Sequence, residues 1–270
     1  EGADTADDMG VSANGAGHIL LHSQAANVVV NAGVQSGSGH ISVEGQVNVS
    51  QAAAGDISTT GNGTIDVAAA TGAISMADGA QATTANANIR YQAKTHMALG
   101  GIAAGTGDVS LTATDGNITD NGAAHAEVVA SALRLKAGGN IGEAAGTHQG
   151  HLDIGVDKMT ADASGSAGIF VTNSKALTVG EVDKVTVKRV DDKAAVADET
   201  DGAKQSDLVT QTNGGAIVLA TSAGDLTVSE GADTADDMGV SANGAGHILL
   251  HSKAANVVVN AGVQSGSGHI

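Results

Sequence analysis

The residues best suited to bind a metal ion are aspartates in two short acidic segments. Both segments read EGADTADDMG, one at the start of the chain and one near its end. Carboxylates at such close spacing offer the hard oxygen ligands that Ca²⁺ takes in proteins. The candidate ligands are Asp4, Asp7, Asp8, Asp233, Asp236 and Asp237.

Neither sequence signature of a known calcium loop accompanies these aspartates. The chain lacks the Gly-Gly-x-Gly-x-Asp nonapeptide of calcium-loaded β-rolls and the twelve-residue loop of an EF-hand. The acidic segments therefore predict either a calcium site or a solvated loop that keeps neighbouring molecules apart. Both interpretations stay open at this point.

Histidine is the second residue type that could bind a metal. His18 and His40 occupy the same Gly-His-Ile context in a chain with ten histidines. If each lies in one coil of a repetitive fold, their rings would stack on adjacent coils. Such a ladder could hold a transition metal, although exposed corner histidines without a ligand explain the pattern equally.

Catalysis on an extended β fold would need carboxylates or a basic residue over a groove, with aromatic rings to stack a sugar. Tyr91 and Phe170 are the only Tyr and Phe, there is no Trp, and Arg occurs only at Arg90, Arg134 and Arg189. We therefore expect that the chain is not an enzyme, and that it uses no cofactor other than Ca²⁺ at the acidic segments.

Composition and charge exclude further classes of protein. The 270 residues include 39 Gly and no Pro or Cys, and the formal net charge is −17. This charge would repel nucleic acid and anionic membrane surfaces, and no run of about twenty apolar residues could span a bilayer. The hydrophobic 41% consists mostly of Ala, Val, Ile and Leu, which predicts a narrow core rather than a thick globular one.

A long internal repeat gives the strongest indication of architecture. Residues 230–270 repeat residues 1–41 with a single change, Gln24 to Lys253, so that position 230 corresponds to position 1. A fixed period indicates a fold that grows by addition along one axis. We interpret residues 1–229 as one tandem unit and residues 230–270 as the start of the next.

Within the unit, short alternating segments predict one strand after another, each bounded by Gly, Asn or Asp. The clearest are 18–23, 27–32, 40–45, 46–51, 64–69, 108–114, 132–137, 168–173, 176–180, 184–190, 216–221 and 225–229. Two segments have a more helical composition, 123–137 and 192–204. A charged stretch without alternation, 191–206, is expected to loop out of the repetitive structure.

Recurring glycines indicate the expected length of each coil. A Gly, a polar residue and then Ile, Val or Leu open strands at Gly17, Gly39, Gly55 and Gly72, among others. The intervals from Gly17 to Gly39 and from Gly55 to Gly72 predict a parallel β-solenoid with about 20 residues per coil. With a strand spacing of about 4.8 Å, one unit would hold about eleven coils over about 50 Å. The absence of Pro fits strands that are paired on both sides.

Two segments resemble the repeats of filamentous-haemagglutinin-type bacterial exoproteins. GTGDVSLTATDGNITDNG (105–122) matches at Gly107, Val109 and Leu111, and residues 138–187 include GIFVTNSKALTVG, which matches at Gly168 and Leu177. The resemblance implies a right-handed parallel β-helix and display or secretion at the surface of a bacterium. The near-identity of the long repeats departs from that family, whose repeats are short and divergent.

These observations lead to two expected functions. The first is a structural segment of a giant extracellular bacterial protein that builds a rod or filament by continuation into further repeats or by self-association. The alternative is the stalk of a haemagglutinin-type adhesin, which attaches to other cells or surface glycans through a binding domain outside this segment.

Overall fold

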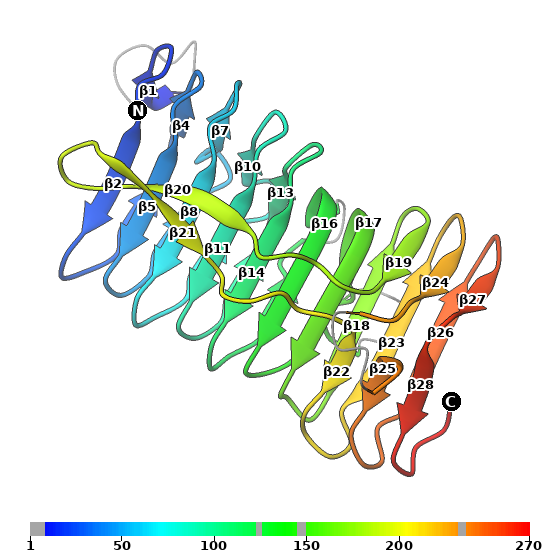
Figure 1. Cartoon of the computed structure of the whole chain (residues 1–270). Coiled ribbons are helices and arrows are strands. Elements are labelled where there is room, and N and C mark those ends of the chain that lie inside the picture. Colours follow the sequence, from blue (N-terminus) through cyan, green and yellow to red (C-terminus); the bar gives the residue numbers. More distant parts are fainter. Residues whose placement is uncertain (1–8, 123–125, 145–149, 232–235) are drawn as a thin grey trace.

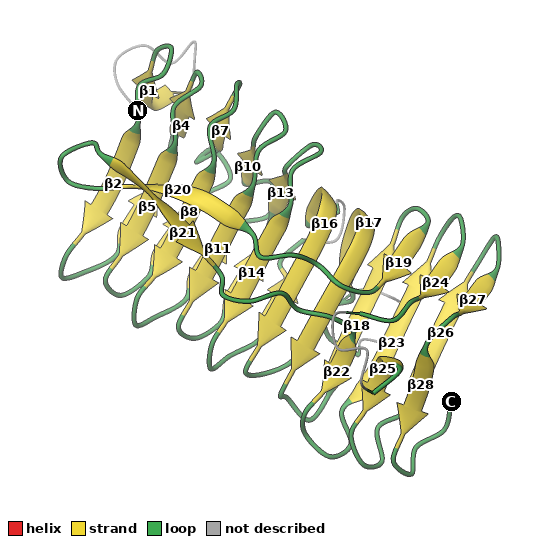
Figure 2. Ribbon diagram, in the orientation of Figure 1, coloured by secondary structure: helices red, strands yellow, loops and turns green. Residues whose placement is uncertain are grey.

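The computed structural model describes residues 9–122, 126–144, 150–231 and 236–270. These residues form a parallel β-solenoid of about ten turns, with about 52% of residues in strands and no helix. The described ends of the chain lie at opposite ends of the stack (Figures 1 and 2). The prediction of an all-β parallel solenoid is confirmed. No helix in this part of the chain could cross a membrane.

Each of the first five coils contributes three short strands, one to each face of the solenoid. Face A contains β1 (Met9–Ala13), β4 (Gly33–Ser36), β7 (Ile57–Thr59), β10 (Gln81–Thr83) and β13 (Gly101–Ala103). Face B contains β2 (Ile19–Ser23), β5 (Ile41–Gly45), β8 (Ile65–Ala69), β11 (Ile89–Ala93) and β14 (Val109–Ala113). Face C contains β3 (Val28–Val30), β6 (Val49–Gln51), β9 (Ile74–Met76), β12 (Met97–Leu99) and β15 (Ile118–Asp120).

The later coils have longer strands. β16 (Val128–Ala137) and β17 (Leu152–Ala163) each run across face A and face B without a break. The strands that follow are β18 (Gly168–Asn173), β19 (Leu177–Val179), β22 (Leu208–Thr210), β23 (Ala216–Thr221) and β24 (Leu226–Val228). The second copy of the repeat supplies β25 (Met238–Ala242), β26 (Ile248–Ser252), β27 (Val257–Val259) and β28 (Gly262–Ser265).

The strand predictions agree closely with these bounds. Residues 168–173 and 216–221 are strands over the predicted range, and the other predicted segments differ mainly at their ends. The helix-like composition of residues 123–137 and 192–204 was misleading, because their described parts contain β16 and β21 (Val196–Thr200). Tertiary pairing outweighs the weak helical preference of Ala-rich segments.

The core is a stack of aliphatic side chains in register. On face B, Leu21 pairs with Val43, and the ladder continues through inward residues of every following coil: Val67, Tyr91, Leu111, Leu135, Ala161, Leu208, Val240 and Val263. Most members are fully buried. Small and β-branched residues therefore fill the narrow interior, as the composition predicts.

The coil is longer than the glycine spacings predict. Successive partners on face B are Ile19, Ile41, Ile65, Ile89 and Val109, and the average over the solenoid is roughly 24 residues per turn. The difference arises because Gly55 precedes β7 on face A whereas Gly72 precedes β9 on face C, so the interval between them is less than a full coil. One tandem unit therefore holds fewer coils than the expected eleven.

One antiparallel hairpin interrupts the stack. After β19 the chain leaves the solenoid and forms β20 (Thr186–Val190) and β21 (Val196–Thr200) before returning at β22. Residues 191–206, expected as a loop, thus contain the second strand of this hairpin. The hairpin lies across β5, β8 and β11 of face B, several coils towards the N-terminus (Figure 1).

The two copies of the repeat do not occupy the same faces. Val240 is the copy of Val11, which is on face A, yet Val240 continues the face B ladder of Leu21. Ile248 is the copy of Ile19 on face B, yet it ends the face C ladder that begins at Val28. The second copy is therefore displaced by about one face around the axis.

Candidate functional site

The surface between the hairpin and face B gathers most of the charged side chains that the structure describes as buried. Backbone groups of β20 fix the hairpin to the solenoid: Val190 N donates to Ser42 Oγ at 2.9 Å, and Lys188 N donates to Thr64 Oγ1 at 2.8 Å. Val187 and Val190 are buried beneath the hairpin. Val187 and Arg189 are two residues apart in β20, so their side chains point to the same side, towards the solenoid.

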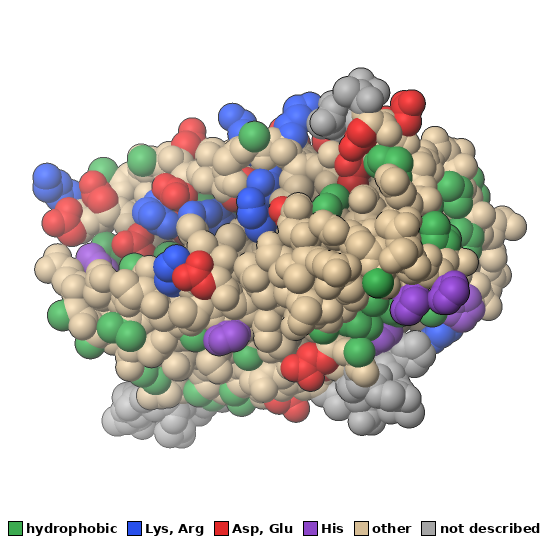
Figure 3. Space-filling model, turned by 90° about the horizontal axis from the view of Figure 1, so that it is seen from below, with side chains coloured by type: hydrophobic (Ala, Val, Ile, Leu, Met, Phe, Trp, Pro, Cys, Tyr) green, Lys and Arg blue, Asp and Glu red, His purple; other side chains and the backbone are tan. Residues whose placement is uncertain are grey.

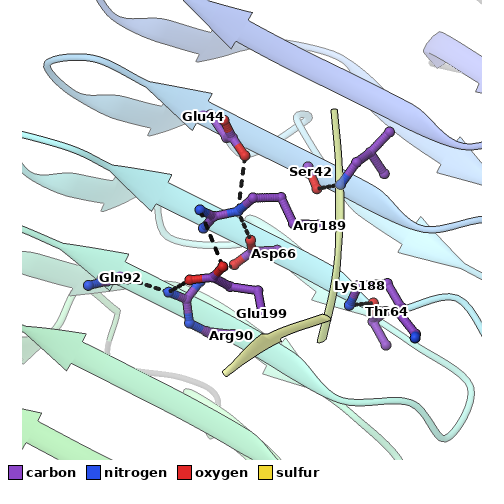
Figure 4. A network of polar contacts seen from close by, with 10 residues as sticks. Ser42, Glu44, Thr64, Asp66, Arg90, Gln92, Lys188, Arg189 and Glu199 are labelled. Carbon is purple, nitrogen blue, oxygen red and sulfur yellow. Dashed lines mark hydrogen bonds and ion pairs between the residues drawn. The ribbon is translucent and has the colours of Figure 1, made fainter. Parts of the chain in front are cut away.

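Asp66 is the centre of an ion network under the hairpin (Figure 4). Its side chain is fully buried, and it projects from β8 between two arginines. Arg90 Nη1 of β11 lies 2.6 Å from Asp66 Oδ1, and Arg189 Nε of β20 lies 2.7 Å from Asp66 Oδ2. Both oxygens of one carboxylate are thus occupied, so Asp66 links two strands of the solenoid to the hairpin.

Two further carboxylates complete this network. Glu199 of β21 lies 3.1 Å from Arg90 Nη2, and Glu44 of β5 lies 3.1 Å from Arg189 Nε. Burial alone would lower the pKa of Arg189, but the Asp66, Glu199 and Glu44 carboxylates outweigh it and raise this pKa. The Arg189 guanidinium therefore stays charged, and the network acts as a set of fixed ion pairs rather than as an acid–base pair.

The base of the hairpin has a second point of attachment. Arg134 of β16 lies 3.2 Å from Asp201 Oδ2 and also donates to the backbone oxygens of Asp201 and Ala203. Gln205 Nε2 donates to the backbone oxygen of Leu135 at 2.9 Å. The returning chain is thereby held against β16 before it reaches β22.

A polar cavity of about 310 Å³ lies between these two attachment points. It is lined by Arg90, Gln92, Thr112, Arg134, Lys136, Glu199, Thr200 and Asp201. Its two arginines already pair with Asp66, Glu199 and Asp201. In the face seen in Figure 3, Lys and Arg side chains lie beside Asp and Glu side chains, while uncharged groups cover much of the remainder. The two arginines of this cavity hold the hairpin in place.

The predicted calcium ligands are only partly within the described residues. Asp4, Asp7, Asp8 and Asp233 lie outside them, so their placement stays a prediction. Asp236 Oδ1 accepts a hydrogen bond from Met238 N at 3.0 Å, and Asp237 adopts a positive φ of 55° before β25. Among the described residues, no three His, Cys, Asp or Glu side chains are grouped so that they could hold a metal ion.

The expected histidine stack is present. The rings of His18 and His40 lie 5.1 Å apart between centroids and are nearly parallel, and their copies His247 and His269 have the same spacing. His18 Nδ1 accepts a hydrogen bond from the backbone nitrogen of His40 at 3.0 Å. This ring nitrogen therefore serves as a corner acceptor for the next coil.

Two neighbouring carboxyl groups that the sequence did not indicate, those of Glu127 and Asp120, lie near the corner before β16. Glu127 is only 2% exposed, and its Oε2 accepts a hydrogen bond from Asp153 N at 2.6 Å. Burial raises the pKa of Glu127 to about 9, and the nearby Asp120 carboxylate contributes to the rise. Glu127 is thus protonated at neutral pH, and its carboxyl is packed beneath the surface.

The scarce arginines and one acidic strand residue are the sequence features that could have indicated the ion network. The three arginines of the chain, noted only for their scarcity, all lie where the hairpin meets the solenoid. Asp66 stands between two buried residues in the strand segment Ile65-Asp66-Val67. A lone acidic residue in a strand and scarce arginines could have suggested a partner, although not which segment supplies it.

These features define a parallel β-solenoid with a strand hairpin fixed to one face by a buried ion network. No family model, curated protein or solved structure matches the chain.

Proposed function

We propose that this chain is a segment of a giant repetitive extracellular bacterial protein that forms a rod or filament at the cell surface. The stacking of the second copy of the repeat carries the proposal. β25 pairs with β28 as β1 pairs with β4, including the same irregularity after the first pair, and β25 itself continues the ladder of β22. A new unit therefore adds to the preceding one without a break in the sheet.

The last described coil exposes the surface on which a further coil would stack. Val257 and Val259 are 42% and 54% exposed, whereas their copies Val28 and Val30 are 9% and 3% exposed. In the first copy, β6 covers these valines through the pairs Val28–Val49 and Val30–Gln51. In the proposed rod, a segment like residues 41–59 stacks on β26–β28 in the same way.

Such a stack suits a mechanical function. Backbone hydrogen bonds run along the axis from coil to coil, and the buried side-chain ladders follow them, which resists bending and stretching. The net charge of −17 keeps neighbouring rods hydrated and apart. A row of equivalent surfaces along the rod would also allow many weak contacts with other cells or surface glycans to add up. The resemblance to haemagglutinin-type exoproteins supports a bacterial surface as the location.

Electron cryomicroscopy of native material from the producing cells tests this proposal. The expected image is a rod with a layer spacing of about 4.8 Å. The ladder from Leu21 to Val240 rises by eight coils, so the unit should repeat about every 40 Å along the axis. A rod that ends in a separate binding domain would identify the stalk of an adhesin. Beads of globular domains, or the absence of any filament, would contradict the proposal.

A further inference from the structure

The displacement between the two copies of the repeat holds on every face. The face A ladder that begins at Val11 ends at Ser252, which is the copy of Ser23 on face B. The ladder that begins at Ile19 ends at Val259, which is the copy of Val30 on face C. The whole second copy is therefore displaced in one direction.

The displacement follows from the number of coils in a unit. Along the ladder of Leu21, Val240 is the ninth member, so it lies eight turns further along the axis. Its counterpart Val11 lies one strand before Leu21 in the first coil. One unit therefore advances the chain by eight turns and about one further face.

The additional rotation of about one face per unit would accumulate along an array of units. The second copy reproduces the first copy's pairings, including Val11–Val34 as Val240–Val263. Because the same sequence folds into the same coils, each following unit would begin about one face further around. An array whose units held a whole number of turns would show no such rotation.

We infer that successive units of the rod are each turned by about one face, so that the β20–β21 hairpins wind around the axis. The inference rests on the tandem rod proposed above. Its consequence concerns the hairpin's outer surface, where Asp192 and Lys193 in the turn and Asp198 in β21 are exposed. The rod offers this surface on more than one side.

The test uses the full chain lengthened by two further copies of residues 1–229, with Lys193→Cys in every hairpin. The chain contains no Cys, so a maleimide-linked gold particle labels only these exposed turns. The unsubstituted array, which has no thiol, is the control for non-specific gold. Electron cryotomography then gives the position of each particle along and around the rod axis.

Particles about 40 Å apart along the axis and on different sides of the rod would support the inference. Particles in a single row on one side would overturn it while leaving the rod intact. An array that forms no rod would overturn both this inference and the proposed function. Helical reconstruction of the unlabelled array provides a second measurement, since the rotation per unit must agree with the gold positions.

Discussion

Arg189 Nε and Asp66 Oδ2 lie 2.7 Å apart although 123 residues separate them in the sequence. Asp66 also pairs with Arg90, so a single buried carboxylate connects β8, β11 and the hairpin. Burial of charge is costly unless every charge has a partner. The attachment of the hairpin therefore depends on this one side chain more than on any exposed ion pair around it.

Replacement of Asp66 by Ala should release the hairpin. The change removes the one fully buried carboxylate of the network and leaves Arg90 with only the partly exposed Glu199, which should cost about 3–5 kcal/mol. Hydrogen exchange of residues 186–200 should rise strongly, because local opening reports the lost stability of this segment. Exchange in β9 and β12, which lie on face C away from the hairpin, serves as an internal reference.

The Lys188–Asp198 pair supplies the matched control. This pair joins β20 and β21, the strands that also supply Arg189 and Glu199 to the buried network, but both of its side chains are exposed. Replacement of Asp198 by Ala should therefore change stability by about 1 kcal/mol or less. Equal effects of the two substitutions would show that the buried network does not fix the hairpin.

Replacement of Gly39 by Ala should destabilise the solenoid. A Cβ at this corner would overlap the backbone oxygen of Gly17 in the preceding coil. Backbone shifts of this kind cost about 1–3 kcal/mol, measurable by chemical denaturation. Ala at Gly180, whose nearest neighbouring atom would be 3.8 Å away, should have little effect. Full tolerance at Gly39 would contradict the close stacking of these corners.

Replacement of Glu127 by Gln should flatten the pH dependence of stability. The native pKa of about 9 lies above the ordinary value of 4.5. Between these values the folded chain holds a proton that the unfolded chain releases, so stability falls as pH rises. The loss approaches about 1.4 kcal/mol for each pH unit. At pH 7 the variant should be more stable by up to about 3 kcal/mol.

Denaturation curves at pH 5, 7 and 8.5 measure this effect for the wild type and the variant. Glu143→Gln, at an exposed carboxyl, is the control and should leave the difference between pH values unchanged. A Glu127→Gln variant that keeps the full wild-type pH dependence would show that this carboxyl is ionised in the folded chain.

Cysteine cross-linking should detect the displaced second copy in the chain itself. Ser241 pairs with Val209 on the face B ladder, so Val209→Cys with Ser241→Cys should react with a short bifunctional thiol reagent. Ser222 follows Thr221 on the ladder that begins at Val11. If β25 occupied the face of β1, Ser222→Cys with Ser241→Cys would react instead. The cross-linked fraction in each double variant is measured by gel mobility.

The strands could be predicted from sequence because each is a local signal. Residues 216–221 and 168–173 are rich in Val and Ile and are bounded by Gly, Asn and Ser, and these features set both ends of the strand. The stacking of His18 on His40 could also be predicted, since it needs only the coil length near those residues. The average coil length could not, because corners of different length add residues that no single spacing reveals.

The ion network and the displacement of the repeat depend on information that is not local. Nothing near Asp66 in the sequence names Arg189 as its partner, because the pairing is set by where the hairpin returns to the stack. The displacement depends on the sum of all coil lengths in the tandem unit. A small error in the expected length of each coil, summed over the unit, is enough to obscure a displacement of one face.

The hairpin also imposes an order in time on the folding of this chain. Its docking surface is built from β5, β8 and β11, which leave the ribosome before residues 186–200. Growth from the N-terminus would first stack coils that expose the Asp66–Arg90 pair to water. Arg189 arrives only later and closes over coils that are already in place. The hairpin thus docks late, because the chain leaves the ribosome from its N-terminus.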